Sequence, residues 1–271
     1  MPKIICATDF NPVSINAARY AAAMAAVHDM DLELVHIFPI PATGRGESSK
    51  REMREEAERE MTILRDILIT IHGDKLNLET TVHPGEVIDE LKRLCDAVDP
   101  WLVIMGIEKA DAFERFLLGN TSLRALQSID HPLLVVPSGN TYSIIKKIGL
   151  ACDLLHVEKS VPVTEIEKIV TRLNCELHVI HVSHTDEKEF QPGKSSQVDS
   201  LKSMLSKLNP EYHFIANPNI EKGIDHISGM LQLDMMIVIP AHRSLLKRLF
   251  HPSHSERVAG TSKIPLLSLH A

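Results

Sequence analysis

The feature that most constrains the fold of this chain is an internal repeat, because six landmarks recur in the same order, 133 to 145 residues apart. A strand-like segment ends at Asp9 and a matching one ends at Asp153, and His36 in the next apolar segment corresponds to His181. The other matches are Ile88-Asp89 with Ile224-Asp225, Trp101–Met105 with Met235–Ile239, Ala112–Leu117 with Leu245–Phe250, and His131-Pro132 with Ile264-Pro265. This order indicates a duplication with its join near residues 139–143, and it predicts two domains, residues 1–140 and 144–271.

Apolar strand-like segments alternate with helical patterns along each copy. In the first copy the expected strands are Lys3–Thr8, Leu32–Phe38, Asn77–Val82, Trp101–Met105 and Leu133–Val136. The expected helices between them are Val13–His28, Lys50–Ile71, Gly85–Val98 and Thr121–Ser128. Asn11 is expected to cap the first helix, with Pro12 in its first turn. The alternation predicts βαβ units and a parallel sheet in each copy, and the polar residues 185–197 are expected to form a loop in the second copy only.

The composition excludes several classes of protein. The formal net charge of −7 argues against a sequence-independent nucleic-acid binder, which carries a basic face. No apolar run approaches the roughly 20 residues that span a bilayer, and the N-terminal segment lacks the pattern of a signal peptide, so we expect no membrane partner. The four cysteines have no metal-like spacing and lie in apolar segments, which predicts reduced core residues and a cytoplasmic protein.

The stretch from Met105 to Ser122 carries the features of a ligand site. It begins at the end of an expected strand and closes on Gly119-Asn120-Thr121-Ser122 at the start of an expected helix. In an open parallel sheet, ligands bind in the crevice beyond the carboxyl ends of the strands. Free N–H groups, hydroxyls and the positive end of a helix dipole favour an anion at such a place. The stretch therefore predicts phosphate binding, although it contains neither a Walker loop nor a Gly-x-Gly-x-x-Gly fingerprint.

These residues resemble the universal stress protein family in its tandem two-domain form, over nearly the whole chain. The nucleotide-binding members of that family carry Gly-x-x-Gly, nine further residues, and then Gly-Ser/Thr. Gly106 and Gly119 stand at the first and third glycine positions, Lys109 stands at the second, and Asn120 replaces the Ser/Thr. The resemblance implies two α/β domains that are flavodoxin-like (adenine nucleotide alpha hydrolase-like), each with a five-stranded parallel sheet and helices on both faces.

The resemblance also implies ATP, with or without Mg²⁺, as the ligand of the first domain. The residues that it places at the nucleotide are Ala7, Thr8, Asp9, Ile37, Met105, Gly106, Lys109, Gly119, Asn120, Thr121 and Ser122. For Asp9, a contact with adenine or ribose and a helix-capping role are equally open, and the hydroxyls at positions 121 and 122 either bind phosphate or cap the helix. Lys109 either pairs with phosphate, or blocks the close approach that glycine allows, or is simply a solvated loop residue.

The second copy departs further from the family pattern. Ile239-Pro240 and Pro252 stand at the two glycine positions, and proline lacks the N–H donor that a backbone phosphate cradle needs. We therefore expect a degenerate second domain that does not bind ATP, although the basic residues between positions 241 and 254 would suit a different anion or a solvated loop.

Neither a catalytic site nor a metal site is predicted. The chain shows no Ser/His/Asp order, no paired carboxylates and no P-loop lysine, so we expect no enzymatic activity beyond slow ATP hydrolysis. The nearest approach to a zinc site is the set His242, His251, His254 and His270, in which no pair has the helical i,i+4 spacing. His36 and His181 occupy equivalent strand positions, which favours a hydrogen bond related to the fold.

Three functions are compatible with these features. The leading hypothesis is a stress-response regulator that senses or stores an adenine nucleotide, with binding ordering the loop between Gly106 and Gly119 and changing a surface for an unknown protein partner. The second is a structural or interaction module without nucleotide, which Lys109 and Asn120 support. The third is a binder or enzyme of another small anionic metabolite. In the family the edges formed by the fifth strands pair between domains, so the resemblance implies an intramolecular pseudo-dimer and leaves a homodimer open.

Overall fold

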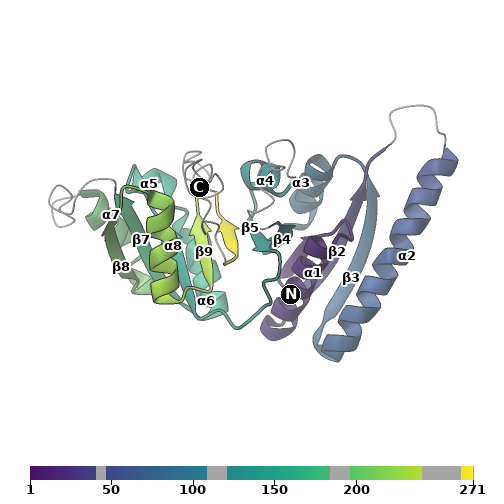
Figure 1. Cartoon of the computed structure of the whole chain (residues 1–271), viewed down its shortest axis with the longest axis horizontal. Helices are drawn as coiled ribbons and strands as arrows, with labels where there is room; N and C mark the ends of the chain where they lie inside the picture. Colours follow the sequence, from purple (N-terminus) through teal and green to yellow (C-terminus); the bar gives the residue numbers. More distant parts are fainter. Residues whose placement is uncertain (41–46, 109–120, 184–195, 240–263, 271) are drawn as a thin grey trace. The chain divides into compact units, whose positions relative to one another are not determined.

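The chain forms two compact units, Met1–Ile144 and Ile145–Ala271 (Figure 1). The computed structural model describes residues 1–40, 47–108, 121–183, 196–239 and 264–270. The division between Ile144 and Ile145 falls one residue after the segment in which the repeat places the join. In the described part of the chain, no helix is both long and apolar enough to cross a membrane.

The first unit is built on a parallel sheet with the strand order β3-β2-β1-β4-β5. Its strands are β1 (Lys3–Ala7), β2 (Asp31–Phe38), β3 (Asn77–Pro84), β4 (Leu102–Ile107) and β5 (Leu133–Pro137). Its helices are α1 (Pro12–His28), α2 (Glu47–His72), α3 (Val87–Val98) and α4 (Thr121–Ser128), with a 3₁₀ turn at Gly73–Lys75. Helix α1 packs on β1, β4 and β5 and contacts α2, while α3 and α4 contact each other and pack on β2, β4 and β5.

The second unit repeats this topology, with the order β8-β7-β6-β9-β10. Its strands are β6 (Lys147–Ala151), β7 (Glu176–Ser183), β8 (Glu211–Ala216), β9 (Met235–Val238) and β10 (Leu266–Ser268). Its helices are α5 (Val157–Ser160), α6 (Val163–Leu173), α7 (Ser196–Met204) and α8 (Ile220–Leu231), with a 3₁₀ turn at Ser206–Leu208. The α/β fold with a parallel sheet in each copy, predicted from the sequence, is confirmed.

Some predicted details differ from the structure. The segment of the second unit that follows its first strand contains two helices, α5 and α6, where the first unit has α1 alone, because Pro162 disfavours helical geometry in the residue before it. Helix α2 begins at Glu47, three residues before the predicted start. Helix α7 begins at Ser196, so the end of the predicted loop 185–197 is helical, and most of that loop lies outside the described residues.

Alanines bring α1 close to the sheet of the first unit. The buried alanines of this helix, all fully shielded from solvent, are Ala17, Ala18, Ala21, Ala22 and Ala25. Their small side chains let the helix backbone approach the apolar strands. The four cysteines are free, and three of them are buried, so the expectation of reduced core residues holds for those three, whereas Cys175 is partly exposed. Burial raises the pKa of the Cys6 thiol to about 12.

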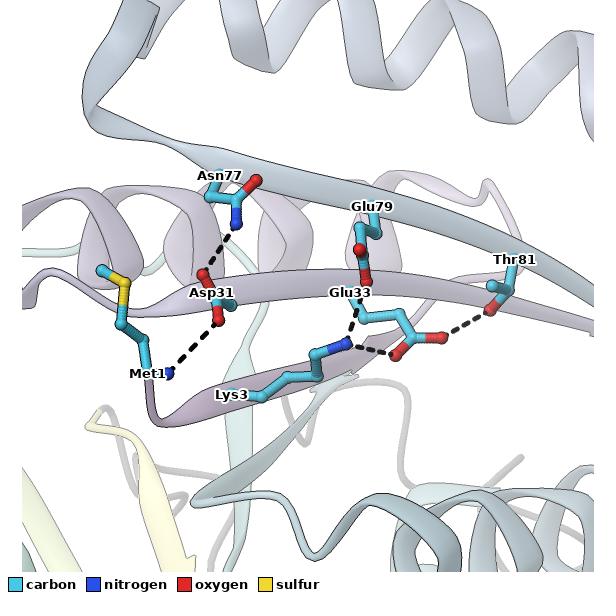
Figure 2. A network of polar contacts seen from close by, with 7 residues as sticks. All are labelled: Met1, Lys3, Asp31, Glu33, Asn77, Glu79 and Thr81. Carbon is cyan, nitrogen blue, oxygen red and sulfur yellow. Dashed lines mark hydrogen bonds and ion pairs between the residues drawn. The ribbon is translucent and has the colours of Figure 1, made fainter.

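A network of charged and polar side chains ties together the amino-terminal halves of β1, β2 and β3 (Figure 2). Lys3 Nζ lies 3.3 Å from Glu33 Oε2 and 2.9 Å from Glu79 Oε2. The Thr81 hydroxyl donates to Glu33 Oε1 at 3.0 Å. Because Glu33 is only 7% exposed, its charge depends on these partners. The network therefore favours one register of the three strands.

Replacing Lys3 by methionine should lower the free energy of unfolding by about 1–2 kcal/mol, because the buried Glu33 carboxylate loses its cation. The hydrogen bond to Glu79, against the opposing effect of burial, raises the pKa of Lys3. Its contribution should be complete below the unfolded-state pKa of about 10.5 and disappear as pH rises through the higher folded-state pKa. Urea unfolding at pH 7 and above pH 10.5 measures both effects.

The matched control is Lys168→Met, which breaks an exposed i,i+3 contact with Glu165 and should change the stability by less than about 0.5 kcal/mol. Equal losses in the two variants would contradict the special role of the network around Glu33.

Candidate functional site

A pocket of about 280 Å³ opens in the first unit at the carboxyl ends of β1, β2 and β4. The chain leaves β1 toward β2 on one side, and β4 pairs with β1 on the other side, so the strand order reverses between β1 and β4. Such a switch point leaves a crevice in an open parallel sheet, and ligands of this fold class bind there. The lining residues are Ala7, Thr8, Asp9, Asn11, Val13, Ser14, Val35, Ile37, Val87, Met105, Gly106, Glu108, Thr121 and Ser122.

The structure brings most of the residues predicted for the site into this one pocket. The predicted residues that line it are Ala7, Thr8, Asp9, Ile37, Met105, Gly106, Thr121 and Ser122. They come from the end of β1, the end of β2, the end of β4 and the start of α4. The other three, Lys109, Gly119 and Asn120, lie outside the described residues. The segment that contains them connects β4 to α4, both of which contribute to the pocket wall.

Hydrogen bonds hold the turn between β1 and α1 in a single shape. The Phe10 N–H donates to Thr8 Oγ1 at 3.1 Å, and the Asp9 N–H donates to Ser14 Oγ at 3.2 Å. The two hydroxyls of Thr8 and Ser14 are 3.1 Å apart. Both residues are buried, so water has little access to these hydrogen bonds.

Asn11 is the N-cap of α1, as the sequence predicted. Its Oδ1 accepts hydrogen bonds from the N–H groups of Val13 at 2.9 Å and Ser14 at 2.8 Å. The Asp9 carboxylate accepts in turn from the Asn11 N–H at 3.2 Å and from Asn11 Nδ2 at 2.9 Å. Asp9 therefore orients the capping residue rather than capping the helix itself, and it is an exposed residue of the pocket lining.

A histidine binds the backbone just after the first strand of each unit, β1 in the first and β6 in the second. His36 Nδ1 donates to the Thr8 carbonyl at 2.8 Å, and its ring stacks on Phe10 with centroids 4.5 Å apart. Phe10 has a φ of 64°, which is uncommon for residues other than glycine. The stack on His36 helps to hold this backbone conformation. In the second unit His181 Nδ1 donates to the Cys152 carbonyl at 2.9 Å, and burial lowers the pKa of His181. The predicted hydrogen bond related to the fold is confirmed at both positions.

Gly106 owes its residue type to packing within the protein. A Cβ atom at this position would lie 2.6 Å from the carbonyl oxygen of Val13 and 2.9 Å from its carbonyl carbon. These are backbone atoms of the first turn of α1, which cannot move aside cheaply. The Ser122 hydroxyl donates to the Gly106 carbonyl at 2.7 Å and so links α4 to β4. The glycine is thus required whether or not a ligand occupies the pocket.

Six lining residues were not predicted: Asn11, Val13, Ser14, Val35, Val87 and Glu108. Val35 lies two residues before Ile37 on the same face of β2, so strand periodicity would have found it. Val87 starts α3, and only the fold brings it beside the other strands. Glu108 and Asp9 are the charged residues of the described lining, and that part of the lining holds no histidine, cysteine, lysine or arginine.

The comparisons with known proteins assign the family. The family model described as the universal stress protein family matches residues 1–137, which is half of the chain and contains the whole pocket. The chain belongs to the universal stress protein family.

Individual relatives agree with this assignment. Universal stress protein MJ0531 of Methanocaldococcus jannaschii is 24% identical over an alignment of 144 residues, and the match covers 49% of this chain and 81% of that protein. The crystal structure of a universal stress protein from Archaeoglobus fulgidus matches with a TM-score of 0.70 at 18% identity and covers 99% of this chain and 96% of its own. Protein PA1789 from Pseudomonas aeruginosa matches with a TM-score of 0.56 at 14% identity, covering 100% of this chain and 92% of its own. These two structures show a shared fold.

The other sites considered in this universal stress protein fall largely outside the described residues. Among the histidines weighed for zinc, His242, His251 and His254 lie there, as does the basic loop of the second copy. His270 is described and follows β10.

Proposed function

We propose that the first unit binds an adenine nucleotide, ATP accompanied by Mg²⁺, in the pocket at the ends of β1, β2 and β4, and that the protein acts as a nucleotide-dependent regulator. The observation that carries the proposal is the convergence of all the described predicted residues, from four separate segments, on one pocket at the switch point of the sheet. Its volume of about 280 Å³ is near the lower end of the range typical of small-molecule sites.

The chemistry of the lining suits a nucleoside. Val35, Ile37 and Met105 supply an apolar wall against which the face of a base can pack. The exposed Asp9 carboxylate accepts hydrogen bonds only, so it would pair with an exocyclic amine or a ribose hydroxyl. Thr121 stands at the start of α4, where the helix dipole favours a phosphate group.

The negative charge of the pocket lining supports a role for Mg²⁺ in binding the nucleotide. Asp9 and Glu108 bring two negative charges to the described lining, which has no basic side chain to balance the phosphates. Mg²⁺ bound to the phosphates would offset this repulsion. The described lining holds no histidine, cysteine or lysine, its candidate bases are the carboxylates of Asp9 and Glu108, and we propose binding rather than catalysis as the activity of the site.

We also propose that residues 144–271 form a degenerate universal stress protein domain that does not bind ATP. The shared strand order supports its origin by duplication. Pro240 and Pro252, at the positions of the two glycines, support the loss of a backbone phosphate site.

Asp9→Ala should weaken ATP and adenosine binding by about 10-fold, since one hydrogen bond to a charged group is lost. Calorimetric titration of the full chain, with and without Mg²⁺, measures the affinity and the number of sites, and we expect one site per chain. The matched control is Asp153→Ala: the Asp153 carboxylate accepts from the Leu155 N–H at 3.0 Å in the equivalent turn of the second unit, and its loss should leave the affinity unchanged. Equal effects of the two substitutions would refute the assignment.

A structural or interaction module without nucleotide is the second candidate. It is favoured by the packing of Gly106 against Val13 and by the hydrogen bond from Ser122 to Gly106, both of which explain residues of the family pattern without a ligand. Absence of binding heat with ATP, with adenosine and with Mg²⁺ present would establish this candidate instead.

A further inference from the structure

Two histidines and a glutamate meet on one face of neighbouring strands in the second unit. His178 lies on β7, and Glu211 and His213 lie on β8, which pairs with β7 (Figure 1). The register places His178 opposite Glu211, and His213 follows two residues later on the same face. No segment of the proposed nucleotide pocket contributes to this cluster, so it is independent of that proposal.

The potential ligand atoms of the cluster converge. His178 Nδ1 lies 3.1 Å from His213 Nε2 and 3.5 Å from Glu211 Oε2, and His213 Nε2 lies 3.8 Å from the same oxygen. Around a tetrahedral zinc ion with bonds of about 2.0–2.2 Å, ligand atoms are about 3.3–3.6 Å apart. The three observed separations bracket this range.

The surroundings of His178 are compatible with the tautomer in which Nδ1 carries no proton and can bind a metal. The residue is 2% exposed, and its Nε2 atom is buried without a hydrogen-bond partner among the described residues. The nearest carboxylate oxygen, Glu176 Oε2, lies 3.7 Å from Nε2. In the tautomer with its proton on Nε2, the imidazole presents the lone pair of Nδ1 to the cluster. In metal sites the second N–H of a ligating histidine usually donates to a carboxylate, and Glu176 supplies a carboxylate near Nε2, beyond hydrogen-bond distance in this structure.

The other two groups complete an accessible set of ligands. The His213 side chain is 19% exposed and the Glu211 side chain is 69% exposed, so an ion can reach the cluster from solvent. Burial and the neighbouring His178 lower the pKa of His213. Two imidazoles and a carboxylate are ligands that zinc accepts, with a fourth position left for water.

We propose that His178, Glu211 and His213 form a zinc-binding site on the sheet of the second unit, with Glu176 as a positioning residue behind His178. The site would give the second domain a ligand of its own, although Pro240 and Pro252 replace the glycines of a nucleotide site in that domain. Zinc bound there would link β7 to β8 and stabilise the folded state by linkage.

The test is a Zn²⁺ titration of the full chain after dialysis against a chelator, in competition with a chromophoric chelator. We expect one zinc ion per chain with a sub-micromolar dissociation constant, a zinc-dependent rise in Tm, and the intense visible absorption of tetrahedral Co²⁺ when cobalt replaces zinc. His213→Asn should weaken binding by at least about 100-fold, and Glu176→Gln by about 10-fold. Both side chains are partly or largely exposed, so the variants should fold.

Two controls make the test decisive. His226→Asn removes an exposed histidine of α8 and should leave the affinity unchanged. A triple variant with His242, His251 and His254 changed to asparagine should also retain the site. Loss of zinc in the triple variant, unchanged affinity in His213→Asn, or no binding of zinc in the native chain would each overturn the proposal.

Discussion

Ile37→Trp should abolish adenine nucleotide binding, with a loss of affinity of at least about 100-fold, or about 2.7 kcal/mol. Ile37 is 7% exposed and lines the pocket at the end of β2. An indole ring at this position would occupy much of a cavity of about 280 Å³ and exclude the base. Calorimetry with ATP and with adenosine measures the loss, and thermal unfolding shows whether the variant remains folded.

Ile37→Val provides the matched control for this substitution. It keeps the branched side chain of the strand and removes one methylene group, so it should change the affinity by only a few-fold and the stability by about 0.5–1.5 kcal/mol. If the tryptophan variant binds ATP as tightly as the native chain, the nucleotide lies elsewhere and the proposed site is wrong. Parallel losses with ATP and adenosine would locate the effect at the nucleoside rather than at the phosphates.

Gly106→Ala should lower the free energy of unfolding by about 2–3 kcal/mol. The added methyl group would meet the backbone carbonyl of Val13 at 2.6 Å, so either β4 or the first turn of α1 must shift. Urea unfolding of the chain without nucleotide measures this effect, which should appear whether or not the protein binds ATP.

Gly229→Ala is the control for the glycine substitution. Gly229 lies in α8 with no atom within 4 Å of an added Cβ, so alanine should raise the stability by about 0.5–1 kcal/mol through its higher helix propensity. A neutral result for Gly106→Ala would show that α1 and β4 separate more easily than the packed contact indicates.

The order of strands and helices was predictable because it depends on local patterns. Asn11 and Pro12 mark the start of α1, and the structure places the cap and the first turn at these residues. The spacing of apolar segments predicted the parallel sheet, and the recurrence of Asp9 as Asp153 predicted the second copy. The ends of the helices were less predictable: α2 begins three residues before the predicted start, and Pro162 separates α5 from α6.

The site was predictable only in part. Ala7 to Asp9, Ile37 and Gly106 follow strand ends, and parallel strands bring their carboxyl ends to one edge, so the sequence and the family resemblance together located the pocket. The reason for Gly106 could not be derived from the sequence, because the atom that excludes a side chain belongs to Val13 in another element. The sequence suggested a ligand for this glycine, whereas the structure shows an internal contact.

By itself, the sequence predicted the repeat and the α/β fold of each copy, because these depend on periodicity and on the chemistry of short stretches. Only the tertiary structure decided which atoms meet across elements. His178 and His213 are 35 residues apart and match no metal motif, yet the register of β7 on β8 places their ring nitrogens 3.1 Å apart beside Glu211. Strand register is a long-range property, and no local pattern in the chain reveals it.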